Sequence, residues 1–363
     1  MPAEHTNPAR VSRRAFSGAV ALGAAAAAAP VGAFVRRSPG ETIVGSGEHT
    51  YRVDHHFAKL PAPYTWQTTH NVAVDAAGNL YVIHEGRKDL KDHPAIFVFD
   101  AKGAFLRAFG SQFQGGGHGI EVRKEGNEEF LYVCAYQQVK AFAKLTLDGE
   151  TVWYRKAPME SGFYAPGEDI STTATWTRQG FLPTNVAFLD DGGFLLADGY
   201  GTFKIHRYDK DARWVSAFGG PGPGEGTFDT AHGLWIDRRP GREPTIVVTD
   251  RAHDTLQVFT MDGAYKETIR GFGLPANVDS HGDLLLVPEL KARVTILGPD
   301  NTPVALLGDG SQRHAQVENL RSKPEEWADG QFVHPHDACF APGGRIYVAE
   351  WVATGRVSML EKA

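Results

Sequence analysis

Apolar and polar residues alternate along most of the chain in short runs, and turns rich in glycine, aspartate or asparagine separate these runs. Two such runs joined by a turn predict a β-hairpin. The pattern occurs six times, first as HNVAVDAAGNLYVIHE from residue 70 and then from residues 118, 184, 232, 276 and 336. Third and fourth strands follow most copies, as in LQVFTMDGAY. Four strands repeated about every 50 residues are typical of a propeller blade.

The sequence therefore predicts an all-β fold, a six-bladed β-propeller with four-stranded antiparallel blades around a central channel. Six copies of one pattern argue against a β-sandwich with accidental similarity. We expect the propeller over residues 50–363, after a linker at 34–49. The segment 50–58 precedes the first copy, and we expect it to add a strand to the last blade and close the ring.

Two insertions interrupt the repeats. Residues 155–182 are rich in Gly, Ser, Thr and Pro and show little alternation, which predicts a loop over one face of the disc. The second insertion spans roughly 311–332 and includes residues 321–327 (RSKPEEW), and we expect a short helix there.

The first 33 residues are typical of an export signal rather than of a folded element. Residues 12–16 (SRRAF) resemble a twin-arginine signal, although Ser17-Gly18 stands where Leu-Lys is usual. A weakly apolar Ala/Gly stretch and the small residues Val31-Gly32-Ala33 follow, as at a cleavage site. The alternative is an uncleaved membrane anchor, but a stretch of about 19 mostly small residues would insert only marginally. We therefore expect 1–33 to engage the twin-arginine export machinery and no stable membrane span, with a periplasmic or extracellular location.

Composition narrows the class of protein. The chain has 42% apolar and 22% charged residues, which is ordinary for a folded globular protein. Its net charge is −6 and it has no basic region, so nucleic acid is not an expected partner. Two cysteines, Cys134 and Cys339, support neither a disulfide framework nor a Cys-rich zinc site, and we expect free thiols.

Histidine is frequent at one position of the repeat. When the six copies are aligned, their first residues are His70, His118, Thr184, His232, Ala276 and His336. The first strand of a blade lines the axis, and alternate blades are about 120° apart in a six-bladed ring. His118, His232 and His336 therefore converge on one point, where three neutral imidazoles with an open fourth position suit zinc or another divalent transition metal. His70 is a further candidate, as a fourth ligand, as a partner of a ligand or as a plain polar residue.

The next position of each copy holds oxygen-bearing residues on several blades: Asn71, Asn185, Asn277 and Asp337. Their side chains suit calcium, although the same residues are also common in turns. The second strand runs back to the mouth where the histidines lie, so it brings Glu85, Tyr136, Tyr200, Arg251 and Trp351 there as well. Tyr200 is a candidate acid or base, and Arg251 a candidate carboxylate-binding group.

The copies resemble NHL repeats, and the stretches PTNVAF…LLADGYGTFKIHRYDKDARWVSAFGG, GTFDTAHGLWID…VVTDRAHDTLQVF and HPHDACFAPGGRIYVAE resemble the lyase domain of the peptidylglycine alpha-amidating enzyme. The resemblance covers about 70–350. It implies an axial zinc on His118, His232 and His336, a catalytic tyrosine at Tyr200 and a substrate-site arginine at Arg251. It also implies a structural calcium held by Asp337 and the backbone carbonyls of Val72 and Ile120.

The chain also departs from that family. Glu85 stands where the family has a second active-site arginine, and Arg87 is displaced by two residues. Gly201 replaces a disulfide cysteine, and the chain contains no copper monooxygenase domain. The resemblance implies cleavage of the C–N bond of an α-hydroxyglycine-type hemiaminal, in a small-molecule or peptide-like substrate, to an amide and glyoxylate. Two alternatives stay open: a calcium-dependent lactonase-like hydrolase that uses Asn185 and Asn277, and a non-catalytic binding scaffold.

Overall fold

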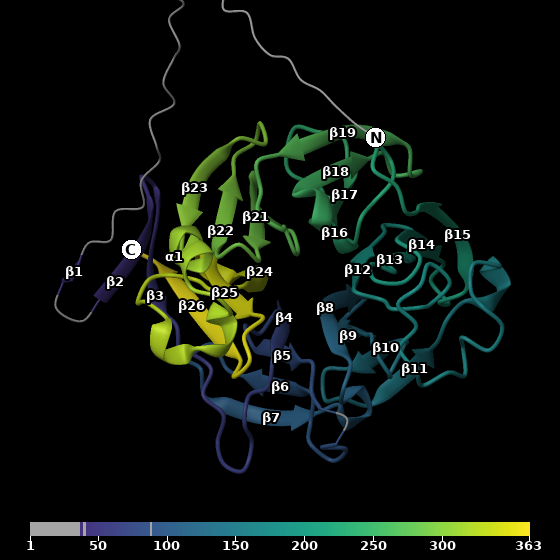
Figure 1. The fold of residues 1–363 in the computed structure, drawn as a ribbon, viewed down its shortest axis with the longest axis horizontal. Coiled ribbons are helices and arrows are strands. Elements are labelled where there is room, and N and C mark those ends of the chain that lie inside the picture. The colour runs from purple at the N-terminus through teal and green to yellow at the C-terminus, as the bar shows by residue number, and fades with distance from the viewer. Residues whose placement is uncertain (1–36, 39–40, 88) are drawn as a thin grey trace, which may run out of the picture. The chain divides into compact units, whose positions relative to one another are not determined.

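Six antiparallel sheets surround a common axis in the computed structural model of the chain, and together they form a six-bladed β-propeller (Figure 1). This confirms the predicted fold class. The structure describes residues 37–38, 41–87 and 89–363, all within one compact unit. The predicted export signal, 1–33, lies outside the described residues.

The first five blades have four strands each, which follow one another in sequence. Blade 1 contains β4 (Thr69–Val74), β5 (Leu80–His84), β6 (Ile96–Phe99) and β7 (Phe105–Phe109). Blade 2 contains β8 (Gly117–Glu125), β9 (Glu128–Ala135), β10 (Ala141–Thr146) and β11 (Thr151–Arg155). Blade 3 contains β12 (Asn185–Phe188), β13 (Phe194–Ala197), β14 (Lys204–Tyr208) and β15 (Trp214–Gly219). Blade 4 contains β16 (Ala231–Asp237), β17 (Thr245–Asp250), β18 (Thr255–Phe259) and β19 (Tyr265–Arg270). Blade 5 contains β20 (Asp279–His281), β21 (Leu284–Glu289), β22 (Arg293–Leu297) and β23 (Pro303–Leu307).

The sixth blade joins the two ends of the propeller. Its strands β24 (Pro335–Ala341), β25 (Arg345–Glu350) and β26 (Arg356–Lys362) pair with β3 (His49–Asp54), and Leu360 lies opposite Val53. The prediction that residues near 50–58 close the ring is thus confirmed.

A further strand, β2 (Glu41–Ser46), pairs with β3 and lies inside the segment 34–49 that the sequence predicts as a linker. The short strand β1 (Arg37–Ser38) pairs with β2. This segment forms a strand because it contains the β-branched run Thr42-Ile43-Val44. Val44 packs in the core between blades 5 and 6, against Leu307 and Phe332.

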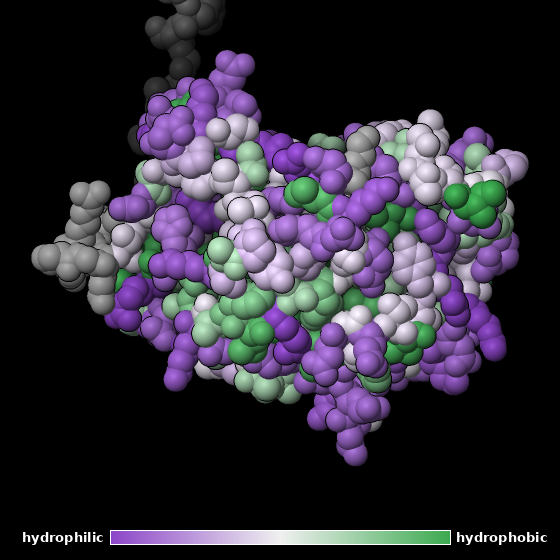
Figure 2. Space-filling model, turned by 90° about the horizontal axis from the view of Figure 1, so that it is seen from below, coloured by the Kyte–Doolittle hydropathy of each residue, from purple (hydrophilic) through white to green (hydrophobic). Residues whose placement is uncertain are grey.

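Residues become more exposed from the middle strands to the outermost strand of each blade. The middle strands are buried along their whole length, as in β5, β6, β17 and β18. The outermost strands expose part of their residues, including Leu106, Val152 and Val215. The rim seen in Figure 2 is accordingly mostly hydrophilic with small hydrophobic areas. Hydrophobic clusters join neighbouring blades, for example Val247 and Leu256 of blade 4 with Leu285 of blade 5, and these clusters hold the inner strands in place.

Both insertions lie at the ends of strands. Residues 156–184 contain only one 3₁₀ turn, η2 (Met159–Ser161), so the predicted loop is confirmed. In the second insertion the helix α1 (Ser311–Gln316) lies before the predicted position, and 321–327 contains parts of two 3₁₀ turns, η4 (Leu320–Ser322) and η5 (Pro324–Glu326). The insertion thus contains the predicted short helix, at its start, and Pro324 disfavours helical backbone at the residue before it.

Cys134 and Cys339 are both free, as predicted. No helix among the described residues is long and apolar enough to cross a membrane.

Candidate metal centre

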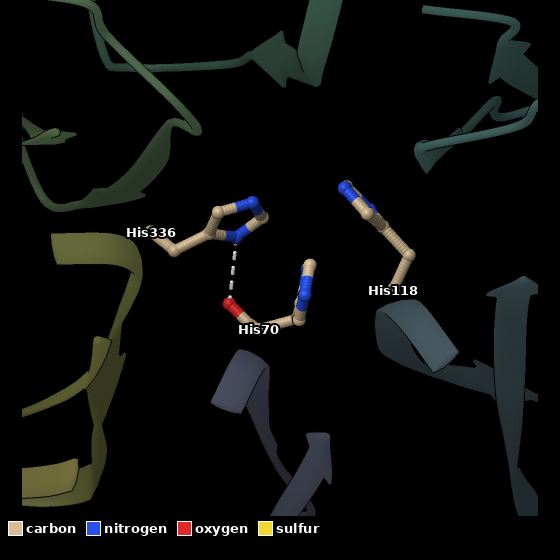
Figure 3. A group of neighbouring side chains, drawn as sticks. All are labelled: His70, His118 and His336. Carbon is tan, nitrogen blue, oxygen red and sulfur yellow. Dashed lines mark hydrogen bonds between the residues drawn. The ribbon is translucent and has the colours of Figure 1, made fainter. Parts of the chain in front are cut away.

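Four histidines meet at the axis, each as the second residue of the innermost strand of its blade. They are His70 on β4, His118 on β8, His232 on β16 and His336 on β24. Nitrogen atoms of His70, His118 and His336 lie within 4.8 Å of one another, and Figure 3 shows these three rings around one central space. The ring of His232 is 4.8 Å from that of His118 and 4.7 Å from that of His336, measured between centroids. The structure therefore brings together all four histidines that the repeat alignment singles out.

A β-bulge sits at each of these histidines. The pairing of β8 with β9, for example, jumps from Gly117–Ala135 to Gly119–Cys134 and leaves His118 without a partner residue. The same shift occurs at His70 and His336, and at His232 a shift between Ala231 and Leu234 leaves both His232 and Gly233 without a partner residue. A bulge re-aims a side chain that would otherwise follow the alternation of the strand, so these bulges turn the imidazoles toward the axis.

A repeated hydrogen bond fixes three of the imidazoles. Nδ1 of His118 donates to the Thr184 carbonyl at 2.8 Å, and Nδ1 of His232 donates to the Ala276 carbonyl at 2.7 Å. Nδ1 of His336 donates to the His70 carbonyl at 2.8 Å (Figure 3). In each case the acceptor is the first residue of the copy in the next blade. Because Nδ1 carries the proton, Nε2 is left with its lone pair, which is the tautomer that a metal ligand needs.

Glycine after the histidine makes two of these contacts possible. A Cβ atom at Gly119 would lie 2.4 Å from the Thr184 oxygen, and one at Gly233 would lie 2.5 Å from the Ala276 oxygen. A side chain at either position would push away the carbonyl that orients the histidine.

His70 is held differently. Its Nε2 lies 3.2 Å from Oε2 of Glu85, and Gln137 donates to the other carboxylate oxygen. A carboxylate only accepts, so Nε2 of His70 carries the proton and Nδ1 keeps its lone pair. Burial raises the pKa of the Glu85 carboxyl, but the hydrogen bonds from His70, Tyr136 and Gln137 outweigh it and keep that pKa below the ordinary value.

Tyr200 and Arg251 lie beside the histidines. The Tyr200 hydroxyl is 2.9 Å from Nε2 of His232, to which it donates, and 3.4 Å from Nε2 of His118. Nη1 of Arg251 donates to the same oxygen at 2.8 Å. Burial raises the pKa of the Tyr200 phenol, and the positive charge of Arg251 opposes that rise. A single phenol oxygen thus links the guanidinium to two imidazoles.

The residues present fit a divalent transition metal. Nε2 of His336 and Nδ1 of His70 are buried and have no hydrogen-bond partner. Such atoms are costly to bury unless a ligand satisfies them. Burial holds the pKa of His118, His232 and His336 well below the ordinary histidine value, so these imidazoles are neutral and able to coordinate.

The carboxylates at the strand ends have a different role from the histidines. Asp198, Asp250, Glu289 and Glu350 are the corresponding residues of blades 3 to 6, and each accepts hydrogen bonds from backbone amides. In blades 1, 2, 4 and 6 the next residue in the chain lies at the mouth, where the residues equivalent to the carboxylates in blades 1 and 2 are His84 and Ala135; in blade 3 the mouth residue is Tyr200, two residues after Asp198. Glu85, Tyr136, Arg251 and Trp351 share this register position, which explains why Glu85 reaches His70.

Asp337 lies next to His336 at a second, acidic part of the axis. Its carboxylate accepts hydrogen bonds from the Val72 amide at 2.9 Å and from Asn277 Nδ2 at 2.6 Å, and Asn185 in turn donates to Asn277. The carboxylate lines a cavity of about 180 Å³ together with Glu121 and Asp279. Burial raises the pKa of Asp337 to about 7.

The first insertion covers part of the mouth. Trp176 packs against Tyr136 and Tyr200 at centroid distances of 6.0 and 5.5 Å, while about half of its surface remains exposed. Sequence reasoning missed this residue, because an insertion has no counterpart in the repeat and therefore no register.

The chain was compared with protein families, curated proteins and solved structures. No family model matches the chain. A curated relative is peptidyl-alpha-hydroxyglycine alpha-amidating lyase 1 of Drosophila melanogaster, 25% identical over 328 residues and 77% of this chain. The chain spans about half of that protein, 54% of its length.

Solved structures share the fold. A gluconolactonase of Xanthomonas campestris is 13% identical with a TM-score of 0.56, over 93% of this chain and 99% of that one. A streptogramin B lyase is 13% identical with a TM-score of 0.51, over 91% of this chain and 93% of that one. A virginiamycin B lyase of Staphylococcus aureus is 12% identical with a TM-score of 0.51, over 89% and 92%. The chain is thus a six-bladed β-propeller that resembles a peptidyl-α-hydroxyglycine alpha-amidating lyase in sequence and shares its fold with propeller lyases and lactonases.

Proposed function

We propose that the protein is a metal-dependent lyase that cleaves the C–N bond of an α-hydroxyglycine-type hemiaminal. The products are an amide and glyoxylate. The observation that carries the proposal is the position of the Tyr200 hydroxyl, in contact with Arg251 and with the metal-facing nitrogens of His118 and His232.

His118, His232 and His336 would hold the metal through Nε2, and His70 is a candidate fourth ligand through Nδ1. A bound zinc or other divalent transition metal would act as a Lewis acid that favours ionisation of a hydroxyl group nearby. The unpartnered nitrogens of His336 and His70 support this assignment.

Tyr200 would move the proton. The phenol first gives up its own proton to solvent; the phenolate Oη then accepts the proton of the substrate hydroxyl and returns it to the nitrogen of the departing amide, which regenerates the phenolate. The C–N electron pair goes to that nitrogen, and the hydroxyl carbon becomes the carbonyl of glyoxylate, so no proton is gained or lost overall. Arg251 stabilises the phenolate through Nη1 and offers its remaining N–H groups to the substrate carboxylate.

We also propose a structural calcium at Asp337, with the carbonyls of Val72 and Ile120. The support is the acidic cavity beside Asp337, where a divalent cation would neutralise buried carboxylates.

Export through the twin-arginine route to the periplasm or the extracellular space is a further proposal, based on residues 12–16. It predicts that Arg13→Lys with Arg14→Lys leaves the protein in the cytoplasmic fraction of its host. Export of the double variant at the wild-type level would contradict the proposal.

The activity is tested by glyoxylate release from α-hydroxyhippurate, with protein reconstituted with zinc. We expect turnover by the wild type and none after His232→Ala. Absence of glyoxylate from the metal-loaded wild type would refute the proposed reaction and favour a binding scaffold, in which the histidine variants lower the melting temperature only.

A further inference from the structure

Arg321 is a cation at the mouth whose guanidinium makes no hydrogen bond or ion pair with the described residues. It belongs to the 3₁₀ turn η4 of the second insertion, and its carbonyl accepts a hydrogen bond from the Ala353 amide at 3.1 Å. Its Cζ atom lies 3.3 Å from the ring centroid of Trp351. Trp351 follows the second strand of its blade, as Arg251 and Tyr136 do in theirs, so Arg321 stands at the same mouth as the histidines.

The surroundings of Arg321 leave it unsatisfied. Its Nε is buried without a hydrogen-bond partner, and the guanidinium makes no ion pair with a described residue. Burial lowers the pKa of Arg321, and the negative charge of Glu85, which contacts His70, opposes that effect. Arg321 as a whole is partly buried, and its buried Nε lacks the hydrogen-bond partner that buried polar groups normally have and that a ligand can supply.

The stacking on Trp351 prepares the side chain for such a ligand. An arginine that lies flat on an aromatic ring keeps its in-plane N–H groups free, and these match the two oxygens of a carboxylate. Nη1 of Arg251 donates to Tyr200, so only its remaining N–H groups are open to the substrate carboxylate, which Arg251 would share with a second guanidinium. A second guanidinium lets Arg251 keep that contact while the substrate carboxylate is bound.

We propose that Arg321 is a substrate-binding residue that holds the carboxylate of the substrate at the mouth of the site. The proposal rests on the proposed function, which defines the substrate as a carboxylate next to the reacting carbon. It assigns substrate specificity to the second insertion, outside the six repeats.

The test measures binding, so that it does not depend on turnover. Hippurate has the acyl-glycine carboxylate of the substrate without its reactive hydroxyl, and hippuramide has a neutral amide in place of that carboxylate. Both are titrated by calorimetry into the full chain, zinc-loaded and zinc-free, as wild type, Arg321→Gln, Arg321→Lys and Lys323→Gln. Lys323 lies two residues away, and Lys323→Gln removes the same positive charge. This variant controls for long-range electrostatic effects.

We expect Arg321→Gln to raise the Kd of hippurate by about ten-fold or more and to leave that of hippuramide unchanged. Arg321→Lys recovers part of the affinity, and Lys323→Gln changes it less than about two-fold. Equal effects on both ligands, no effect on hippurate, or no hippurate binding by the wild type would overturn the proposal. Arg321-dependent hippurate binding without any glyoxylate release would leave this anion site standing and refute only the lyase activity.

Discussion

Nδ1 of His336 lies 2.8 Å from the carbonyl oxygen of His70, so the last inner strand of the propeller orients its histidine on the first. The two residues are 266 positions apart in the chain, and the contact forms only when the ring closes. The same bond recurs from His118 to Thr184 and from His232 to Ala276. Ring closure therefore also orients His336 and leaves its Nε2 with a free lone pair.

The histidine cluster predicts that the purified protein contains a metal. We expect about one transition metal per chain in protein purified without added metal, and its loss after His232→Ala or His336→Ala, because three imidazoles with an open position suit such a metal. The measurement is elemental analysis. His56→Ala, which changes an exposed histidine outside the cluster, is the matched control and should keep the metal. Calcium alone, unaffected by His232→Ala, would contradict the axial site.

Removal of the Tyr200 hydroxyl tests its role in proton transfer separately from metal binding. Tyr200→Phe should lower kcat for glyoxylate release by about 100-fold or more, because general acid–base groups contribute on that order. The metal content should stay at the wild-type level. Tyr136→Phe is the control, because its ring packs 5.3 Å from that of Tyr200 while its hydroxyl bonds Gln137. If both variants lose the same activity, the effect belongs to aromatic packing and not to proton transfer.

The repeat register explains why the histidine cluster was predictable from the sequence. Aligned copies place equivalent residues at equivalent heights, so His118, His232 and His336 were expected to converge. The same register also predicted the neighbours Tyr200 and Arg251, and the closing strand near residue 50. These inferences need only the alternation of apolar residues and the symmetry of the fold.

Other features were not predictable because the repeat pattern describes neither local irregularities of a strand nor individual side-chain contacts. The bulges at the four histidines break the alternation locally, and no residue type marks them. The bond between His70 and Glu85 depends on side-chain rotamers. Trp176 and Arg321 lie on insertions, for which the repeat supplies no position.

The first insertion is attached through a buried ion pair. Nζ of Lys140 lies 2.5 Å from Glu168, both side chains are almost fully buried, and Lys140 also donates to the Thr173 carbonyl. Lys140→Met should lower the free energy of unfolding by about 3–5 kcal/mol, because it leaves a buried carboxylate without its cation.

Adding Glu168→Leu to Lys140→Met should recover much of that loss, since no buried charge then remains. Denaturant titration measures both variants. Lys210→Met, which removes an exposed lysine that pairs with Asp211, should stay within about 0.5 kcal/mol of the wild type. A Lys140→Met effect as small as that of the control would show that the pair does not anchor the insertion.

Acid should destabilise the propeller through His206, which lies in a buried chain of hydrogen bonds. The Trp214 indole donates to Nδ1 of His206 at 3.1 Å, and Nε2 of His206 lies 2.8 Å from the Tyr164 hydroxyl, which donates to Asp198. A second proton on His206 would sit at Nδ1 and face the indole N–H, donor against donor. Burial, with help from the charge of Lys204, lowers the pKa of His206 to about 3.

The unfolded chain binds that proton near the ordinary histidine pKa of about 6.5. Between about pH 6.5 and pH 3 the unfolded state therefore holds more protons than the folded state, and the free energy of unfolding falls as the pH is lowered. His206→Gln, with an amide that can still accept from Trp214 and donate to Tyr164, should reduce this slope by up to about 1.4 kcal/mol per pH unit. Denaturant titrations of the metal-free protein from pH 7 to pH 4 measure the slope. Parallel wild-type and variant curves over that range would mean that His206 does not titrate on unfolding.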